Sequence, residues 1–567
     1  MTKGFGLPKL TMALVLAATL GPMAVTSLVY GQAVTGTLLG TVTDPNNAVV
    51  AGATITITEV HTNIRRSAPT NENGNYAFDN LSMGTYSVEV ERAGFKKVLK
   101  SGVEVSVNST TRTDLQLEPG TVSEQVTVTA EEAPLQTDRA DISRIIESKQ
   151  VSQLPLGFNR NFQGLIFLVP GSTRPSRPHS QFFNSQDSLE SKVNGNSRLS
   201  NNFQIEGVDD NEKTGLLQVL IPSADAIESV SVATSNFDAE LGRAGGAVST
   251  VTLKSGTNAI HGSVFGFGNN DNLQASEYFT GLKSPTHYRQ LGATIGGPIK
   301  KNKIFYFGDY QYTSDELGII NRHTVPYKEW YNGDFRNAPT KIYDPATGNS
   351  DGTGRQQISC NGVLNVICPN RISAIATKLL GFLPGPNISG AAFAQTNFVF
   401  SEVRVKKTNA FDTKINYQIN GKNNLSYRFS YQRPRVFDPG TYGIYGGPTN
   451  GGFAGTGIQN TISTAANYTR TFSSTLVFEG RFGVSWYHNV ATSTAAGLKT
   501  SDEVGIKNVN TDDFSSGLTT ININGFSTPT LGFSNSLPWN RGETTYVGSG
   551  IITKIRGQVW RRDPQES

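Results

Sequence analysis

The sequence predicts a mainly β protein made of three consecutive parts: an N-terminal β-sandwich, an α+β middle region and a long antiparallel sheet. Three observations predict this class. With 30 Phe and 19 Tyr but 17% charged residues, plus 59 Gly, the composition is typical of aromatic strands joined by turns, not of long helices. Apolar and polar residues alternate through 411–419 and 424–431, which is the period of a strand. The length of 567 residues predicts two or three domains.

Composition also limits the class of protein. After residue 33 there is no apolar stretch of roughly 18 residues, so a helical membrane protein is excluded. A membrane barrel remains open, because its alternating strands average to a polar composition. The net charge of +4 is small and evenly spread, which argues against a nucleic-acid partner.

Residues 1–33 are predicted to be a secretory signal. Two lysines form a basic start, Leu10–Leu20 forms the apolar segment, and Gly31-Gln32-Ala33 matches a small-x-small cleavage site. A short membrane anchor is the alternative, but Gly21-Pro22 interrupts the apolar segment. We therefore expect export.

Residues 34–118 are predicted to form a small antiparallel sandwich of six or seven strands. Gly36–Thr43, Ala53–Glu59 and Thr85–Glu91 have strand patterns and are separated by polar turns. The phrases GTVTDPNNAVVAGATITIT and TNENGNYAFDNLSMGTYSVEVERAGF resemble the carboxypeptidase-regulatory-like domain, a transthyretin- or starch-binding-like fold. The resemblance implies a spacer or docking role. Carbohydrate binding is the alternative, although no Trp precedes Trp330 to form a sugar platform.

Residues 119–130 are predicted to be a linker that carries a partner-binding strand. The segment reads EQVTVTA: Glu124, Gln125, Val126, Thr127, Val128, Thr129 and Ala130. It is similar to the TonB box of TonB-dependent outer-membrane receptors, which implies the periplasmic TonB protein as a partner. Its β-branched residues favour an extended backbone that pairs edge-to-edge with another strand. The alternatives are a last strand of the sandwich and a plain linker.

Residues 131–254 are predicted to be a plug domain. The segments NFQGLIFL at 161–168 and NNFQIEGVDD at 201–210 resemble phrases of plug domains, the second as a strand and turn. At Ser235–Phe267, glycines 242, 245 and 246 precede an extended run, the turn KSGTN and a second strand. This stretch resembles the end of the plug and the start of the barrel in TonB-dependent receptors, more narrowly in the Oar-like branch. An ordinary hairpin is the alternative.

Two local features of this region carry further expectations. Ile142, Ile145 and Ile146 share one side of a helix, which predicts a helical start for Asp141–Gln153. The acidic cluster at 209, 210 and 212 lacks EF-hand spacing, so we expect a solvated turn instead of a calcium site.

Residues 255–567 are predicted to be the first part of a transmembrane antiparallel β-barrel. The hairpin at 411–431 has one apolar and one polar face, and the segments 464–472 and 475–487 form a second pair. In an outer-membrane barrel, the apolar faces meet lipid and the polar faces line water. QLGATIGGPIKKNKIFYFGDYQY at 290–312 resembles the second and third barrel strands of Oar-like receptors. Thr313–Phe400 is expected to be an external ligand-contacting loop.

No catalytic, cofactor or metal site is predicted. Cys360 and Cys368 are expected to form a disulfide after export, with two free thiols as the alternative. Two cysteines without a nearby histidine cannot fill a tetrahedral metal shell. A Gly-x-Ser-x-Gly match at 348–352 lies in a polar loop without the strand and helix that a nucleophile elbow needs.

The family resemblance implies a TonB-dependent receptor or transporter in the outer membrane of a Gram-negative-type bacterium, with the N-terminal domain in the periplasm. It implies three partners: TonB with its proton-driven inner-membrane complex, outer-membrane lipid, and an unknown large ligand such as a glycan, peptide or metal chelate. A non-transporting structural or adhesive surface protein is the alternative.

The same resemblance predicts that the chain is a fragment. Family barrels resemble roughly 22-stranded structures, whereas residues 256–567 are expected to hold about eight or nine strands. The end at 561–567 also lacks the terminal aromatic of a closing strand. Because an open barrel leaves unpaired backbone groups in lipid, the chain as given is expected to aggregate or be degraded.

Overall fold

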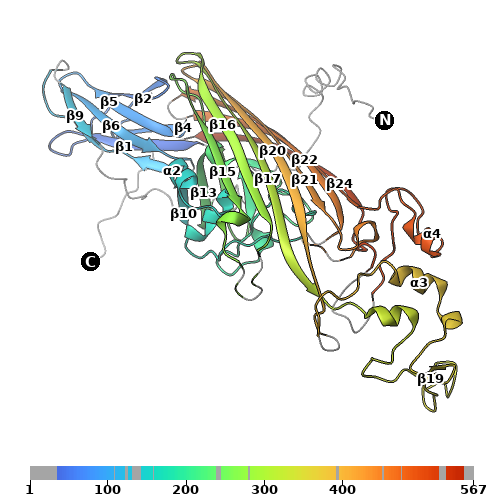
Figure 1. The fold of residues 1–567 in the computed structure, drawn as a ribbon. Coiled ribbons are helices and arrows are strands. Elements are labelled where there is room, and N and C mark those ends of the chain that lie inside the picture. The colour runs from blue at the N-terminus through green and yellow to red at the C-terminus, as the bar shows by residue number, and fades with distance from the viewer. Residues whose placement is uncertain are drawn as a thin grey trace, which may run out of the picture.

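The computed structural model describes residues 35–107, 109–121, 125–129, 142–157, 159–237, 244–276, 278, 281, 283–390, 395–447, 449, 453–473, 476–522 and 531–554. The expected signal at 1–33 lies outside them. Three bodies follow one another along the chain, and long strands dominate the third (Figure 1). Within the described ranges, no helix is long and apolar enough to cross a membrane.

The first body, which we call the sandwich, consists of two packed sheets. Its strands are β1 Gly36–Thr43, β2 Thr54–Glu59, β3 Arg65–Pro69, β4 Asn75–Leu81, β5 Gly84–Glu91, β6 Lys97–Val105, β7 Thr110–Arg112, β8 Leu115–Gln116 and β9 Gln125–Thr129. One sheet has the order β4-β1-β7 with β8 also on β1, and the other has the order β3-β2-β5-β6-β9. Alternate side chains such as Leu38, Ile55 and Val88 point between the sheets and form one buried core.

The expected strands are present, but the sandwich is mixed and not purely antiparallel. β1 runs parallel to β7 and β8, and β6 runs parallel to β9. β6 and β7 lie in different sheets, so the chain crosses between sheets before β7 pairs with β1. A crossover connection permits parallel pairing, whereas a tight hairpin does not.

We expect residues 34–118 to fold in isolation as a soluble sandwich. Extending the fragment to residue 130 adds β9, whose Val126 packs on the core, and should raise the free energy of unfolding by about 1 kcal/mol. Urea unfolding of both fragments, with NMR shift dispersion as the test of folding, checks this. A disordered spectrum for 34–118 would contradict the predicted boundary.

The second body, which we call the central domain, is a small mixed sheet with short helices. It contains β10 Ile142–Glu147, α2 Ser148–Gln153, β11 Asn202–Ile205, β12 Val208–Asp209, β13 Ile227–Ser235, β14 Val248–Leu253 and the 3-10 helices Phe162–Leu168, Arg198–Ser200 and Ala224–Ala226. The sheet order is β10-β13-β14-β11-β12. The expected strand and turn at 201–210 form β11, a turn with positive φ at Glu206 and Gly207, and β12.

Two segments of the chain approach each other closely at Gly246. A Cβ there would lie 2.5 Å from Asn201 Oδ1, where the chain enters β14 beside β11. Gly242 lies outside the described residues.

The helical start predicted for Asp141–Gln153 is wrong. Ile142–Glu147 forms β10, paired antiparallel with β13, and the helix α2 begins at Ser148. β-branched isoleucines favour a strand when a neighbouring strand offers a ladder. Their sequence spacing suits one helical face, but pairing with β13 decides the outcome.

The third body, which we call the large sheet, contains eight strands in sequence order. They are β15 His261–Asn270, β16 Thr286–Lys300, β17 Ile304–His323, β20 Phe398–Asn420, β21 Asn423–Asp438, β22 Gly455–Ser473, β23 Leu476–Ser493 and β24 Trp539–Lys554. Each strand pairs antiparallel with the next, and β15 and β24 are its two edges, so the sheet is open. The expected fold class, mainly β with a long antiparallel sheet, is confirmed.

The large sheet exposes apolar side chains and buries polar ones. In the β20–β21 hairpin, Phe411 and Tyr427 are exposed, whereas Lys414 and Arg428 are only 7% and 1% exposed. This is the reverse of a soluble sheet and is typical of a sheet whose outer face meets lipid. The central domain covers part of the polar face, which was expected to line water (Figure 1).

Short and long connections lie at opposite ends of the large sheet. Residues 301–303 and 421–422 are tight turns, whereas 324–397 and 494–538 are long connections. The long ones carry β18 Ser359–Cys360, β19 Val363–Leu364, α3 Ala374–Leu380 and α4 Thr500–Val504. The sandwich lies at the short-turn end (Figure 1). The loop predicted from residue 313 begins later, because β17 continues to His323.

Candidate functional site between the central domain and the large sheet

A buried ion pair joins the central domain to the large sheet near the short-turn end. Lys414 Nζ lies 2.7 Å from Glu206 Oε1 and 3.0 Å from the carbonyl oxygen of Leu253. Glu206 Oε1 also accepts from the backbone N–H of Leu253 at 2.8 Å. Both side chains are nearly inaccessible, at 8% and 3% exposed. A pair this deep is held by hydrogen bonds as well as charge, so losing one partner leaves the other without compensation.

A second ion-pair network joins the two bodies farther along β20. Asp187 of the central domain pairs with Lys406 of β20, and its other carboxylate oxygen lies 3.1 Å from Arg177 Nη2. Arg404 of β20 pairs with Asp315 of β17 at 2.8 Å. Burial, reinforced by the nearby Arg404 charge, lowers the pKa of Arg177 to about 9.

Neutral side chains of the large sheet bind the backbone of the central domain. Gln459 Nε2 donates to the carbonyl of Val219 at 3.1 Å, and the N–H of Ile221 donates to Gln432 Oε1 at 3.0 Å. Such side-chain contacts satisfy irregular backbone that lacks a strand partner. They fix residues 219–221 to the polar face of the large sheet.

The acidic cluster at 209–212 is not the solvated turn that was expected. Asp210 and Glu212 are each 1% exposed. Glu212 accepts from the N–H of Thr214 at 2.6 Å and from that of Gly215, so backbone donors replace water. Complete burial raises the pKa of Asp210 well above its ordinary value. The described residues contain no group of three or more metal-ligating side chains.

An aromatic and cationic cluster lies where the central domain meets the long-connection half of the sheet. Arg541 Cζ of β24 lies 3.9 Å from the ring centre of Phe183, and its Nη2 donates to Tyr487 Oη at 2.7 Å. Trp539 packs edge-on against Phe183 and Phe453. Side chains of this kind supply cation–π and hydrogen-bonding contacts to ligands.

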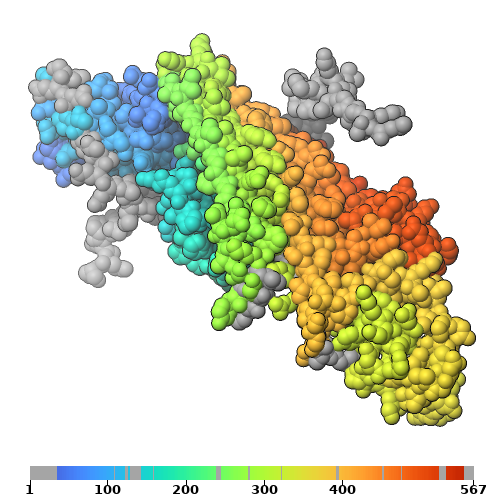
Figure 2. All heavy atoms as spheres, viewed as in Figure 1, coloured from blue at the N-terminus to red at the C-terminus, as the bar shows by residue number. Residues whose placement is uncertain are grey.

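The long connections pack into one body at the far end of the sheet. Leu383, Tyr442 and Val504 come from three connections and share one buried cluster. Phe382 stacks on Tyr445 with ring centres 3.6 Å apart. The yellow and red-orange segments adjoin in Figure 2. An ordered body of loops at this end can present a binding surface on fixed geometry.

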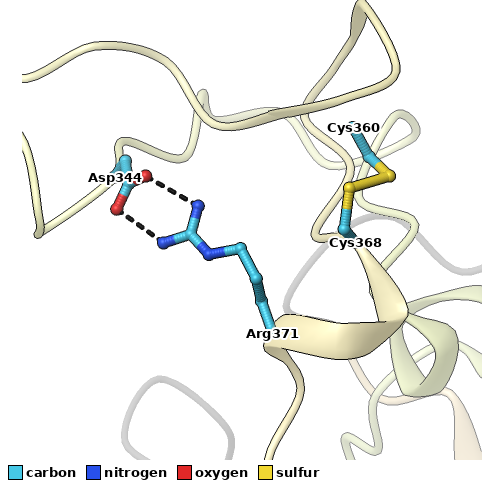
Figure 3. The surroundings of a disulfide bond; sticks show 4 residues. All are labelled: Asp344, Cys360, Cys368 and Arg371. Atoms are coloured by element: carbon cyan, nitrogen blue, oxygen red, sulfur yellow. Dashed lines mark hydrogen bonds and ion pairs between the residues drawn. A yellow bond between two sulfur atoms is a disulfide. The ribbon is translucent and has the colours of Figure 1, made fainter.

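A disulfide and a bidentate ion pair brace the longest connection. Cys360 and Cys368 are joined with their Cα atoms 5.0 Å apart, beside the pair in which Arg371 donates to both carboxylate oxygens of Asp344 at 2.7 and 2.8 Å (Figure 3). The segment 348–352 consists of turns without the strand-to-helix elbow of a nucleophile.

We expect Asp344 to titrate at about 2, because hydrogen bonds from Arg371 lower its pKa. Its stabilising effect is present above the ordinary value of 3.8 and is lost as the pH falls through about 2. Carboxyl NMR titration of an Arg371→Met variant should show the Asp344 pKa raised toward the ordinary value, while the N–H of Ala346 still donates to the carboxylate at 3.0 Å. Arg336→Met is the control, since it should shift Asp334 instead; an unchanged Asp344 in Arg371→Met would contradict the prediction.

The predicted partner-binding segment lies away from these contacts. Gln125–Thr129 forms β9, the last strand of its sheet, in register with Lys97–Ser101 of β6. Glu124 and Ala130 lie outside the described residues. The sequence did not identify the Glu206–Lys414 pair, although the polar face that carries Lys414 was visible as an alternating pattern.

Comparison with known families now identifies the large sheet. Residues 252–558, more than half of the chain, match the family described as "Outer membrane beta barrel domain". The chain belongs to this family. Residues 37–118 of this outer-membrane barrel protein match the carboxypeptidase regulatory-like domain, which confirms the resemblance noted for the sandwich. The exposed apolar face is therefore the face that meets the outer membrane.

Known relatives of this outer-membrane barrel protein include a transporter. The TonB-dependent transporter Oar of Myxococcus xanthus is 24% identical over 310 residues, which cover 51% of this chain and 28% of the relative. The chain thus matches less than a third of the relative's length.

Two solved structures are similar in part. The outer-membrane transporter YddB of Escherichia coli has a TM-score of 0.38 at 10% identity, covering 62% of this chain and 40% of its own. A mutant ferric enterobactin receptor of Pseudomonas aeruginosa, in complex with enterobactin, has a TM-score of 0.35 at 11% identity, with coverages of 62% and 41%. Both TM-scores are low, so the family assignment rests on the sequence match to residues 252–558.

Proposed function

We propose that the protein is a TonB-dependent receptor and transporter that captures a large ligand outside the cell and moves it inward with energy supplied through TonB. The observation that carries this proposal is the folded central domain on the polar face of the large sheet, held by the Glu206–Lys414 and Asp187–Lys406 pairs. A barrel filled in this way is no passive pore. Passage requires the buried polar contacts to rearrange, and rearrangement requires an energy source.

The two ends of the sheet suggest the direction of transport. Barrels of the outer membrane have short periplasmic turns and long external loops. By that rule the loop body around Tyr442 faces outward and the sandwich lies in the periplasm. Ligand capture is assigned to the loop body and the cluster around Arg541 and Phe183, which lies beneath it.

TonB is proposed to dock on Gln125–Thr129. β9 ends its sheet, so its outer edge is paired with no other described strand and can accept an added strand through main-chain hydrogen bonds. Glu124 and Ala130 complete the segment in sequence.

The test is uptake by cells that produce the protein, with and without TonB. Cells are offered three labelled probe classes: an oligosaccharide, an oligopeptide and an iron chelate. We expect surface binding of one class in both strains, and internal accumulation only with TonB and an intact proton gradient. Binding without TonB-dependent accumulation would overturn transport and support a structural or adhesive role.

A further inference from the structure

The sandwich is attached to the short-turn end by polar contacts. Thr35 Oγ1 donates to Glu479 Oε1 of β23 at 3.3 Å, and the Asn80 amide lies against the same carboxylate. Arg66 Nη2 donates to Thr471 Oγ1 of β22 at 3.2 Å. The chain links the sandwich to the central domain once, between β9 and β10. The hydrogen bonds to β22 and β23 therefore hold the sandwich against the large sheet.

A third contact reaches the start of the barrel. The backbone N–H of Asn258 donates to the carbonyl of His61 at 3.1 Å. Asn258 lies between β14 and β15, so the sandwich touches the junction of the central domain and the large sheet as well as β22 and β23.

These contacts border a partly open chamber between the three bodies. Its volume is about 420 Å³, and its wall includes Ile57 and Tyr86 of the sandwich, Glu228 and Lys254 of the central domain, and Asn416 and Asn467 of the large sheet. The wall combines amide and charged groups with apolar side chains from all three bodies, such as Ile57, Leu253 and Phe305. Lys414, whose ion pair holds the central domain, also lines it.

We propose that the sandwich is an inner lid, and that the chamber beneath it is the compartment a solute enters after passing the central domain. The inference rests on the proposed transport function. A volume of about 420 Å³ corresponds to one small ligand, so the docked sandwich narrows the way out for a larger solute. Swinging away from Glu479 and Thr471 would widen it.

Thiol labelling tests the lid without knowledge of the solute. Both native cysteines are in the disulfide, so Ser255→Cys places a single thiol on the chamber wall. N-ethylmaleimide should label this thiol. A maleimide on a polyethylene glycol wider than the chamber should react with it at least about tenfold more slowly than with the thiol of Asn73→Cys, which is exposed on a sandwich turn. Adding Thr471→Val and Glu479→Ala to the Ser255→Cys variant should raise the rate of its reaction with the large maleimide by roughly tenfold, because hydrogen bonds that hold the lid are lost.

A staple provides the second measurement, in case the weakened variant does not fold. The His61→Cys, Asn258→Cys pair joins backbones already in hydrogen-bond contact, so mild oxidation of membranes should form a disulfide. Single-cysteine variants are the controls. Formation of the staple supports docking of the sandwich at this place. Rapid reaction of Ser255→Cys with the large maleimide would overturn the lid. If labelling and oxidation give the expected results but no probe accumulates through TonB, the proposed transport function is wrong and only the docking of the sandwich is supported.

Discussion

Replacing Lys414 with methionine should destabilise the docked central domain by about 3–5 kcal/mol. The Glu206 carboxylate would remain buried at 3% exposure without its cation, retaining the N–H of Leu253 as a donor. Chemical denaturation in detergent micelles measures the change. Trp539 reports on docking, because its ring packs against Phe183 of the central domain.

The matched control is Lys213→Met, which removes a lysine from an ion pair of similar length. Lys213 Nζ lies 2.9 Å from Asp209, but its side chain is 47% exposed, so the expected cost is below about 1 kcal/mol. Adding Glu206→Gln to Lys414→Met should recover part of the loss, since the uncompensated charge is removed. Equal costs for the two lysine variants would show that the buried pair does not hold the central domain.

Much of the fold can be predicted because its signals are local. The β20–β21 hairpin follows from strict alternation, and the structure pairs Phe411 with Tyr431 and Asp412 with Ser430 along it. The turn between β11 and β12 follows from Glu206-Gly207, where a glycine accepts positive φ readily. The eight described strands of the sheet agree in number with the expected eight or nine, although β24 was not located from the sequence.

The features that could not be predicted depend on distant partners. Ile142–Glu147 becomes a strand because β13, far along the sequence, offers a ladder. Asp210 and Glu212 are buried where the central domain supplies backbone donors and Arg541 of the large sheet lies 3.8 Å from Glu212. Lys414 was visible on a polar face, but sequence periodicity does not show that Glu206 covers it. Each of these requires the packing of two bodies, which no local pattern encodes.

Replacing Val126 or Val128 with proline should abolish TonB-dependent uptake, reducing it by at least about tenfold, while membrane insertion and surface binding persist. Proline removes a backbone donor and fixes φ, so β9 can no longer form regular ladders. Val126 is in register with Val98 of β6 and packs on the sandwich core, so urea unfolding of the isolated sandwich must accompany the uptake measurement. Thr127→Ala is the control, because it keeps the backbone N–H of the same strand and should leave uptake intact. Uptake at the unmodified rate by both proline variants, with insertion verified, would show that TonB does not act through this segment.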